Sequence, residues 1–154
     1  MLAQLRLYWK NYLWQSLCAT AAILVVLLIL NLRQMVIVSS IGATTFIVFM
    51  KPSNPFAKPR SVIGGHLVGV LVGSVFSLLP RPTPWAASLV YAVAVGAALF
   101  WMAVTDTEHP PAAGTALSVV MSGDVWWIAV LAVLTSALLL SGFHRLLRRY
   151  LKDL

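Results

Sequence analysis

The sequence predicts an all-α membrane protein that crosses the bilayer several times. Of its 154 residues, 60% are hydrophobic and only 10% are charged, whereas soluble domains carry roughly 25% charged residues. The apolar residues fall into about six segments separated by short polar stretches. A soluble domain of this size has too little interior to hide so much apolar surface, so lipid must act as its solvent.

An apolar helix needs about 20 residues to cross the hydrocarbon core of a bilayer. Four full spans are predicted, each with no acidic or basic side chain: 13–30, 62–79, 85–104 and 125–143. Two further segments, 35–50 and 110–121, would measure only about 24 Å and 18 Å as helices. They are predicted as short or broken half-helices. Residues 34–39 are rich in β-branched side chains, so an extended stretch and a single tilted helix are both open there.

The basic residues predict the topology. If all six segments cross, nine of the eleven basic residues lie on the side of the two termini and two lie on the other side. The positive-inside rule then places both termini in the cytoplasm, with a bacterial inner membrane as the expected location. Re-entrant short segments would weaken this charge bias, so six crossings are preferred. Headgroup contacts also explain the net charge of +7 without a nucleic-acid partner.

The order long, short, long occurs twice along the chain, which indicates a 3+3 repeat with halves of opposite orientation. Within 62–79, Gly65, Gly69 and Gly73 recur every four residues. Small residues at this spacing line one helix face and let a neighbouring backbone approach closely. We interpret them as packing residues, within one subunit or between subunits. A subunit this small has little interior, so a homodimer or larger homo-oligomer is expected.

Residues 105–115 have the most unusual composition. Asp106, Glu108 and His109 fall within four residues and are followed by Pro110 and Pro111. Proline cannot continue a helix that arrives from the preceding segment, but it suits the first turn of a new one. A short helix is therefore expected to begin near Pro110. Its N-terminus would direct free N–H groups and a positive dipole towards an anion.

Two stretches of this chain resemble a known family. Residues 106–117 read DTEHPPAAGTAL and residues 52–66 read PSNPFAKPRSVIGGH, with Gly42-Ala43 upstream. In this order they resemble the HPP family of integral membrane proteins, whose His-Pro-Pro is 109–111 here. The resemblance covers nearly the whole chain and implies a multi-spanning protein. Some plant and cyanobacterial members are associated with nitrite transport, and some carry a soluble regulatory domain. Residues 1–154 are expected to form one transmembrane domain without the soluble regulatory domain.

The leading hypothesis is a transporter or channel for a small inorganic anion, such as nitrite, with its site at the N-termini of the two short helices. The expected substrate-binding residues are Ser40, Gly42, Thr44, Thr45, His109, Pro110, Pro111, Gly114 and Thr115. Lys51, Lys58 and Arg60 would form a basic cytoplasmic mouth that concentrates anions. Asp106 and Glu108 would cap the helix after the prolines, pair with a cation, or carry a coupling proton.

Two other functions are consistent with the sequence. A membrane-embedded enzyme would use Asp106, Glu108 and His109 as metal ligands or as acid and base groups, but three such residues within four positions give poor ligand geometry. A structural or accessory subunit would explain the glycines and leave 105–115 without a role. We therefore predict no enzyme, no metal and no cofactor, and the lipid bilayer and a small anion as partners. His66 is expected to be a hydrogen-bonded structural group and His144 an interfacial one.

Overall fold

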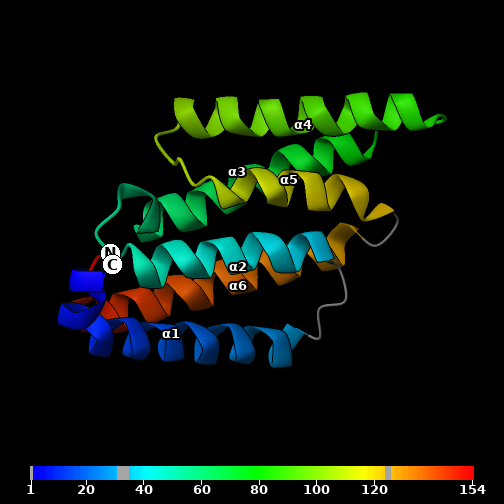
Figure 1. The fold of residues 1–154 in the computed structure, drawn as a ribbon. Helices are drawn as coiled ribbons and strands as arrows, with labels where there is room; N and C mark the ends of the chain where they lie inside the picture. Colours follow the sequence, from blue (N-terminus) through cyan, green and yellow to red (C-terminus); the bar gives the residue numbers. More distant parts are fainter. Residues whose placement is uncertain (1, 31–34, 124–125) are drawn as a thin grey trace.

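The computed structural model describes residues 2–30, 35–123 and 126–154. This part of the chain forms six α-helices and no strand (Figure 1). The helices are α1 (Leu2–Leu30), α2 (Met35–Met50), α3 (Pro59–Ser77), α4 (Pro84–Val104), α5 (Pro111–Met121) and α6 (Trp126–Leu147). Two short 3-10 helices, η1 (Pro55–Ala57) and η3 (Arg148–Tyr150), precede α3 and follow α6. The predicted all-α class is confirmed.

Consecutive helices run in alternate directions, and both termini lie at the same end of the molecule (Figure 1). The α2–α3 and α4–α5 loops also lie at that end. The prolines act as predicted, since α4 ends at Val104 and α5 begins at Pro111. α2 is helical from Met35 onward, so residues 35–39 take the helical and not the extended alternative. Residue 34 lies outside the described part of the chain.

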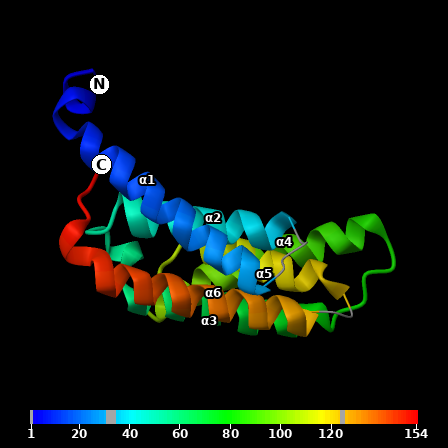
Figure 2. The same cartoon turned by 90° about the horizontal axis from the view of Figure 1, so that it is seen from below.

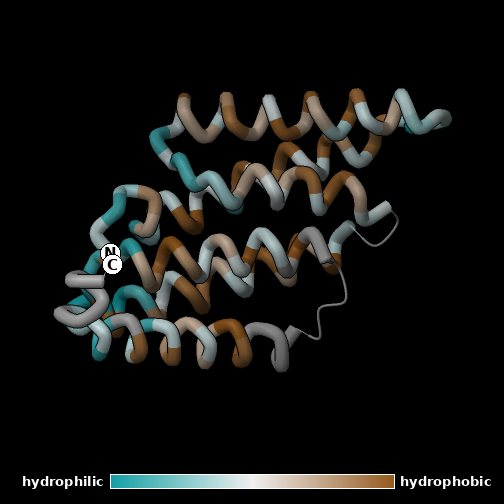
Figure 3. The backbone as a smooth tube through the Cα atoms, viewed as in Figure 1, coloured by the Kyte–Doolittle hydropathy of each residue, from teal (hydrophilic) through white to brown (hydrophobic). Residues whose placement is uncertain are grey.

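The outer surface of the helices is apolar along their length. Large hydrophobic side chains are exposed there, including Trp85 at 80% and Phe100 at 61%. Within the described residues, three helices are long and apolar enough to cross a membrane: α3, α4 and Trp126–Tyr150. The most hydrophilic segments gather at the end that carries the termini (Figure 3). This distribution suits a protein whose solvent is lipid.

α5 is the shortest of the described α-helices and lies at the centre of the bundle. It packs against α2, α3, α4 and α6, while α1 packs mainly on α2 and α6, and α4 mainly on α3 and α5. α1 crosses the other helices obliquely on one side (Figure 2). If α1, α2 and α3 are exchanged with α4, α5 and α6 in that order, the neighbours of α1 (α2 and α6) become the neighbours of α4 (α5 and α3). The pairing and the opposite directions of α1 and α4 support the expected 3+3 inverted repeat.

The contact between α3 and α5 depends on Gly65, Gly69 and Gly73, which we call the glycine stripe. A Cβ atom on Gly69 would lie 2.5 Å from the carbonyl oxygen of Ala112, and one on Gly73 would lie 2.8 Å from that of Ala116. Gly65 meets the loop before α5 in the same way. No side chain fits between backbones this close. The stripe therefore serves packing within one subunit, which was one of the two arrangements expected from the sequence.

We expect Gly69→Ala to destabilise the fold, because its methyl group would overlap the Ala112 carbonyl of α5. Overpacking of this kind costs about 1–3 kcal/mol. Gly96→Ala on α4 is the matched control, since a Cβ atom there meets nothing within 4 Å. The measurement is the thermal unfolding midpoint in detergent. Equal midpoints for the two variants would contradict the packing assigned to the stripe.

Candidate functional site

Polar side chains from three helices and one loop meet in the interior of the bundle. α2 supplies Ser40 and Thr44, which lie four residues apart on one helix face. α3 supplies His66, α5 supplies Thr115, and the α4–α5 loop supplies His109. Each of these five side chains is at most 5% exposed. We refer to these five residues as the polar cluster.

The end of α4 turns the chain back towards α3. Asp106 has a φ of 53°, and the N–H groups of Asp106 and Thr107 donate to the carbonyls of Ala103 and Met102 at 3.3 and 2.9 Å. This is the Schellman pattern, with aspartate in the left-handed position that glycine usually takes. The Asp106 carboxylate pairs with Arg60 at 3.0 Å, and both side chains are exposed. Asp106 therefore closes α4 and does not enter the polar cluster.

The α4–α5 loop then lies against the first turns of α3, where Gly64 and Gly65 leave room for it. A Cβ atom on Gly64 would lie 2.6 Å from Cγ2 of Thr107, and one on Gly65 would lie 2.7 Å from Cβ of His109. This close approach places the His109 ring in the interior, where it is fully buried. Its Nδ1 lies 2.8 Å from the carbonyl oxygen of Phe56 in η1.

Hydrogen bonds join the polar cluster into one chain. The Thr44 hydroxyl lies 2.9 Å from Nε2 of His109 and 3.0 Å from Nε2 of His66. Nδ1 of His66 lies 2.8 Å from the Thr115 hydroxyl, which lies 3.2 Å from the Ser40 hydroxyl. The two imidazole rings are 5.0 Å apart between centroids. The chain therefore runs from η1 through both histidines to the middle of α2.

Counting hydrogens gives this chain a direction. A carbonyl oxygen only accepts, so Nδ1 of His109 must carry the hydrogen that bonds to Phe56. A charged ring is costly in this buried position, and in a neutral His109 the Nε2 atom must accept from the Thr44 hydroxyl. Thr44 then has no hydrogen left for His66, whose Nε2 must donate to Thr44. Nδ1 of His66 in turn accepts from Thr115. The Ser40 hydrogen goes to the Pro111 carbonyl, so in this arrangement the 3.2 Å contact between the Ser40 and Thr115 hydroxyls holds no hydrogen. The two histidines are therefore opposite tautomers.

The polar cluster contains four of the nine residues predicted to bind substrate: Ser40, Thr44, His109 and Thr115. Pro111 adds its carbonyl oxygen, which accepts from the Ser40 hydroxyl at 2.7 Å. This bond joins α2 to the first turn of α5. Donors of the two short helices thus meet as expected from the sequence, although through side chains and not through helix ends.

The other four predicted residues lie outside the polar cluster. Gly42 is exposed on another face of α2 and has no neighbour for a Cβ atom within 4 Å. The Thr45 hydroxyl donates to a carbonyl of its own helix at 2.8 Å. Pro110 is exposed. Gly114 lies where α2 and α5 cross, with its Cβ position 3.4 Å from Cβ of Ser40.

The helix ends do not form the expected anion site. The first two N–H groups of α5, on Ala112 and Ala113, donate to the carbonyls of His109 and Pro110 at 2.8 and 3.2 Å. No side chain caps this helix, so neither Asp106 nor Glu108 takes the capping role, one of the three that were expected. Asp106 takes another of them, because it pairs with Arg60. α2 also begins at the end of the molecule opposite to the start of α5 (Figure 1). The two N-termini therefore do not converge, because the two helices are antiparallel.

The remaining charged residues of the prediction lie at the surface, at the end that carries the termini. Glu108 is exposed although it is adjacent to the buried His109. Lys51 and Lys58 are exposed as well. Asp106 and Glu108 are thus exposed, whereas the His109 side chain is fully buried. Within the described ranges, no group of three or more His, Cys, Asp or Glu side chains is placed to hold a metal ion.

Sequence reasoning missed the part that His66 plays in this site. It was expected to be a hydrogen-bonded structural group, and its hydrogen bonds to Thr44 and Thr115 confirm that. It also joins the other members of the polar cluster. The signal in the sequence was its position next to Gly65, because a polar side chain beside the packing stripe must enter the interior.

His144 was expected at the interface, and this was wrong. It is 1% exposed, and its Nε2 donates to the carbonyl oxygen of Pro52 at 3.1 Å. The C-terminal tail holds the same loop, since the Leu154 N–H donates to the Met50 carbonyl at 3.0 Å and the Ser53 N–H to Asp153 at 3.0 Å. The α2–α3 loop is thus held from two sides before it reaches the Phe56 carbonyl.

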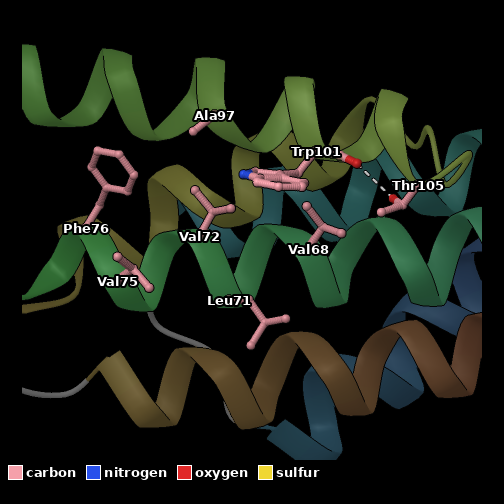
Figure 4. Close-up of a pocket in the computed structure, with 8 residues that line it drawn as sticks. All are labelled: Val68, Leu71, Val72, Val75, Phe76, Ala97, Trp101 and Thr105. Atoms are coloured by element: carbon pink, nitrogen blue, oxygen red, sulfur yellow. Dashed lines mark hydrogen bonds between the residues drawn. The ribbon is translucent and has the colours of Figure 1, made fainter.

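A separate hollow of about 380 Å³ lies between α3 and α4 (Figure 4). It is lined by Val68, Leu71, Val72, Val75, Phe76, Ala97, Trp101 and Thr105. This lining is almost entirely apolar and contains no residue predicted to bind substrate. The hollow therefore differs in chemistry from the polar cluster, which is closed to the surroundings.

Comparison with known proteins identifies the family. Residues 4–153 match the transmembrane region of the HPP family. The chain belongs to the HPP family. Two transmembrane proteins of Dictyostelium discoideum are 31% and 29% identical to it over 148 residues, which cover 86% of this chain and 52% and 48% of those proteins. The HPP chain thus spans about half the length of these relatives. No solved structure matches it.

We expect the two buried histidines of this HPP protein to be opposite neutral tautomers. In protein labelled with 15N-histidine and reconstituted in nanodiscs, His109 should show a protonated Nδ1 and His66 a protonated Nε2 at neutral pH, because the Phe56 carbonyl fixes the direction of the chain. The Phe56 carbonyl belongs to the backbone, so a substitution of Phe56 would not remove it. Each 15N signal is therefore assigned by substituting one histidine at a time. Identical tautomers at the two positions would contradict the assigned direction.

Proposed function

We propose that this HPP protein transports a small inorganic anion across the membrane, with nitrite as the first substrate to test. The observation that carries the proposal is the polar cluster itself. A membrane protein places hydroxyl and imidazole groups in its interior at a free-energy cost, and such groups mark substrate pathways in many transporters. Here five of them converge from three helices and a loop.

The chemistry of the polar cluster favours an anion over a cation. Its hydroxyl and imidazole N–H groups can donate hydrogen bonds to an anion. A carboxylate would favour a cation, but the acidic residues in the described part of the chain, Asp106, Glu108 and Asp153, are all exposed. Lys51 and Lys58 at the end near η1 add a positive potential that would concentrate anions there. The family association with nitrite agrees with this preference.

A carrier suits this geometry better than an open channel. The five side chains of the polar cluster are closed off, with exposures of 0–5%, so a solute can reach them only after helices separate. α5 meets α2 through the bond from Ser40 to Pro111 and the contact at Gly114. We propose that α2 and α5 separate there to admit the anion, which would take over the hydrogen bonds between them.

We also propose that both termini face the cytoplasm of a bacterial cell, as the distribution of basic residues predicts. The outer face of α4 carries exposed apolar side chains, among them Leu89, Val93 and Phe100. In a homo-oligomer this face would pack against a second copy. The small interior of one subunit is the reason to expect such an assembly.

Thr44→Val should reduce nitrite uptake into proteoliposomes by about tenfold or more, because a hydrogen bond to a charged group contributes about 1.5–3 kcal/mol. Thr45→Val is the matched control on the same helix. Both threonines are buried, but the Thr45 hydroxyl bonds only within its helix. Uptake should therefore be retained in Thr45→Val. Wild-type uptake no faster than in protein-free liposomes would reject anion transport, and equal uptake by the two variants would remove the polar cluster from the pathway.

Cysteine labelling tests the orientation. In a Cys18→Ala background, we expect Pro82→Cys in the α3–α4 loop to react with an impermeant maleimide in intact cells. Ser53→Cys in the α2–α3 loop should react only after permeabilisation. Both positions are exposed, so reactivity reports the side of the membrane and not burial. Labelling of Ser53→Cys in intact cells would reverse the proposed orientation.

A further inference from the structure

The polar cluster has a second hydrogen-bond arrangement that uses the same heavy-atom positions. The Thr44 hydroxyl lies 3.1 Å from the carbonyl oxygen of Ser40 as well as 2.9 Å from Nε2 of His109. It has one hydrogen and two acceptors within reach, so it can serve only one of them at a time. In the neutral arrangement that hydrogen points to His109. Rotation about the C–O bond of Thr44 redirects it to Ser40.

This rotation makes room for one additional proton. When a proton from solvent adds to the lone pair of Nε2 on His109, the new N–H donates to the Thr44 oxygen, and the Thr44 hydrogen turns to the Ser40 carbonyl. The Thr44 oxygen has two lone pairs, so the bond from Nε2 of His66 persists. The proton is the only atom gained and no covalent bond breaks. His109 becomes an imidazolium, with its Nδ1 hydrogen still on the Phe56 carbonyl.

The additional positive charge has no counter-ion in the interior. α2 presents Thr44 to His109, η1 presents a carbonyl, and α3 presents the neutral His66. The charged groups on these elements and their loops are at the surface: Lys51, Lys58, Arg60 and its partner Asp106, and Glu108. Burying a charge without a counter-ion is strongly unfavourable, because the charge loses its hydration. An anion bound at the polar cluster would supply the missing charge.

We propose that His109 takes up a proton together with the transported anion, so that the protein is a proton–anion symporter with Thr44 as its hydroxyl switch. This inference rests on the proposed anion transport. Each ligand offsets the cost of burying the other, and by linkage each raises the affinity for the other by the same factor. Glu108, the residue expected from the sequence to carry the coupling proton, is not needed for this role because it is exposed and outside the chain of hydrogen bonds.

His109→Asn and His144→Asn form a matched pair for the test. Both histidines are buried and donate to a carbonyl of the segment that contains the α2–α3 loop and η1, at Phe56 and Pro52. An asparagine amide N–H can replace Nδ1 of His109 at the Phe56 carbonyl, but it cannot take up a proton. Only His109 also contacts Thr44. The two variants thus separate loss of a loop contact from loss of a proton site.

The experiment measures the initial rate of nitrite uptake into proteoliposomes, corrected for protein-free liposomes, at equal pH and with the outside about one pH unit more acidic. Wild-type and His144→Asn rates should rise severalfold and at most about tenfold, in proportion to proton concentration at an unsaturated site. The lumen should acidify with uptake. In His109→Asn, the uptake that remains should have the same rate with and without the gradient.

Wild-type uptake without any response to the proton gradient would overturn the symport and leave anion transport in place. Retention of the response in His109→Asn would also overturn it. Absence of nitrite uptake in the wild type at both pH values would reject the proposed function and the symport together. If His109→Asn is inactive or unfolded, 15N spectra of the wild type decide. Nitrite should convert Nε2 of His109 from an acceptor to an N–H, and an unchanged neutral ring would overturn the proposal.

Discussion

The close approach of α3 and α5 is the constraint on which the rest of the structure depends. Gly65, Gly69 and Gly73 present no side chain to α5 and to the loop before it, so their backbones come within a distance that no Cβ atom would tolerate. Lipid provides no hydrophobic force between helices, and backbone proximity of this kind supplies packing energy in its place. The shortest helix of the protein is thereby held at the centre of the bundle.

This contact also creates the candidate site. With α5 held against α3, Thr115 comes within 2.8 Å of His66. Gly64 and Gly65 let the preceding loop lie on α3, so that His109 enters the interior beside the same histidine. α2 then adds Thr44 between the two rings. The same glycines thus hold α3 against α5 and position the polar cluster, so a substitution at these glycines would displace both.

Charged side chains and buried neutral polar groups occupy different parts of the molecule. Acidic and basic side chains of the α2–α3 and α4–α5 loops remain at one end, where Arg60 and Asp106 pair in the open. The interior contains neutral groups whose hydrogens can be redistributed. A centre of this kind binds charge only when a partner charge arrives with it, because the surrounding helices offer no fixed counter-ion. That property, more than any single residue, is the basis of the proposed coupled transport.

The sequence by itself determined the class of the protein, the number and type of its helices, the breaks at Pro110 and Pro111, and the packing use of the glycine stripe. These features are local, since they depend on the length of apolar segments, on the missing N–H of proline and on residue spacing along one helix.

Tertiary structure decided which polar residues meet. Gly42 and Thr44 are two residues apart, yet they lie on different faces of α2, and only Thr44 enters the site. His66 and His109 are 43 positions apart in the chain, and only the contact between α3 and the α4–α5 loop brings their rings within 5.0 Å. Glu108 and His109 are neighbours in sequence, but the turn that closes α4 leaves one at the surface and buries the other.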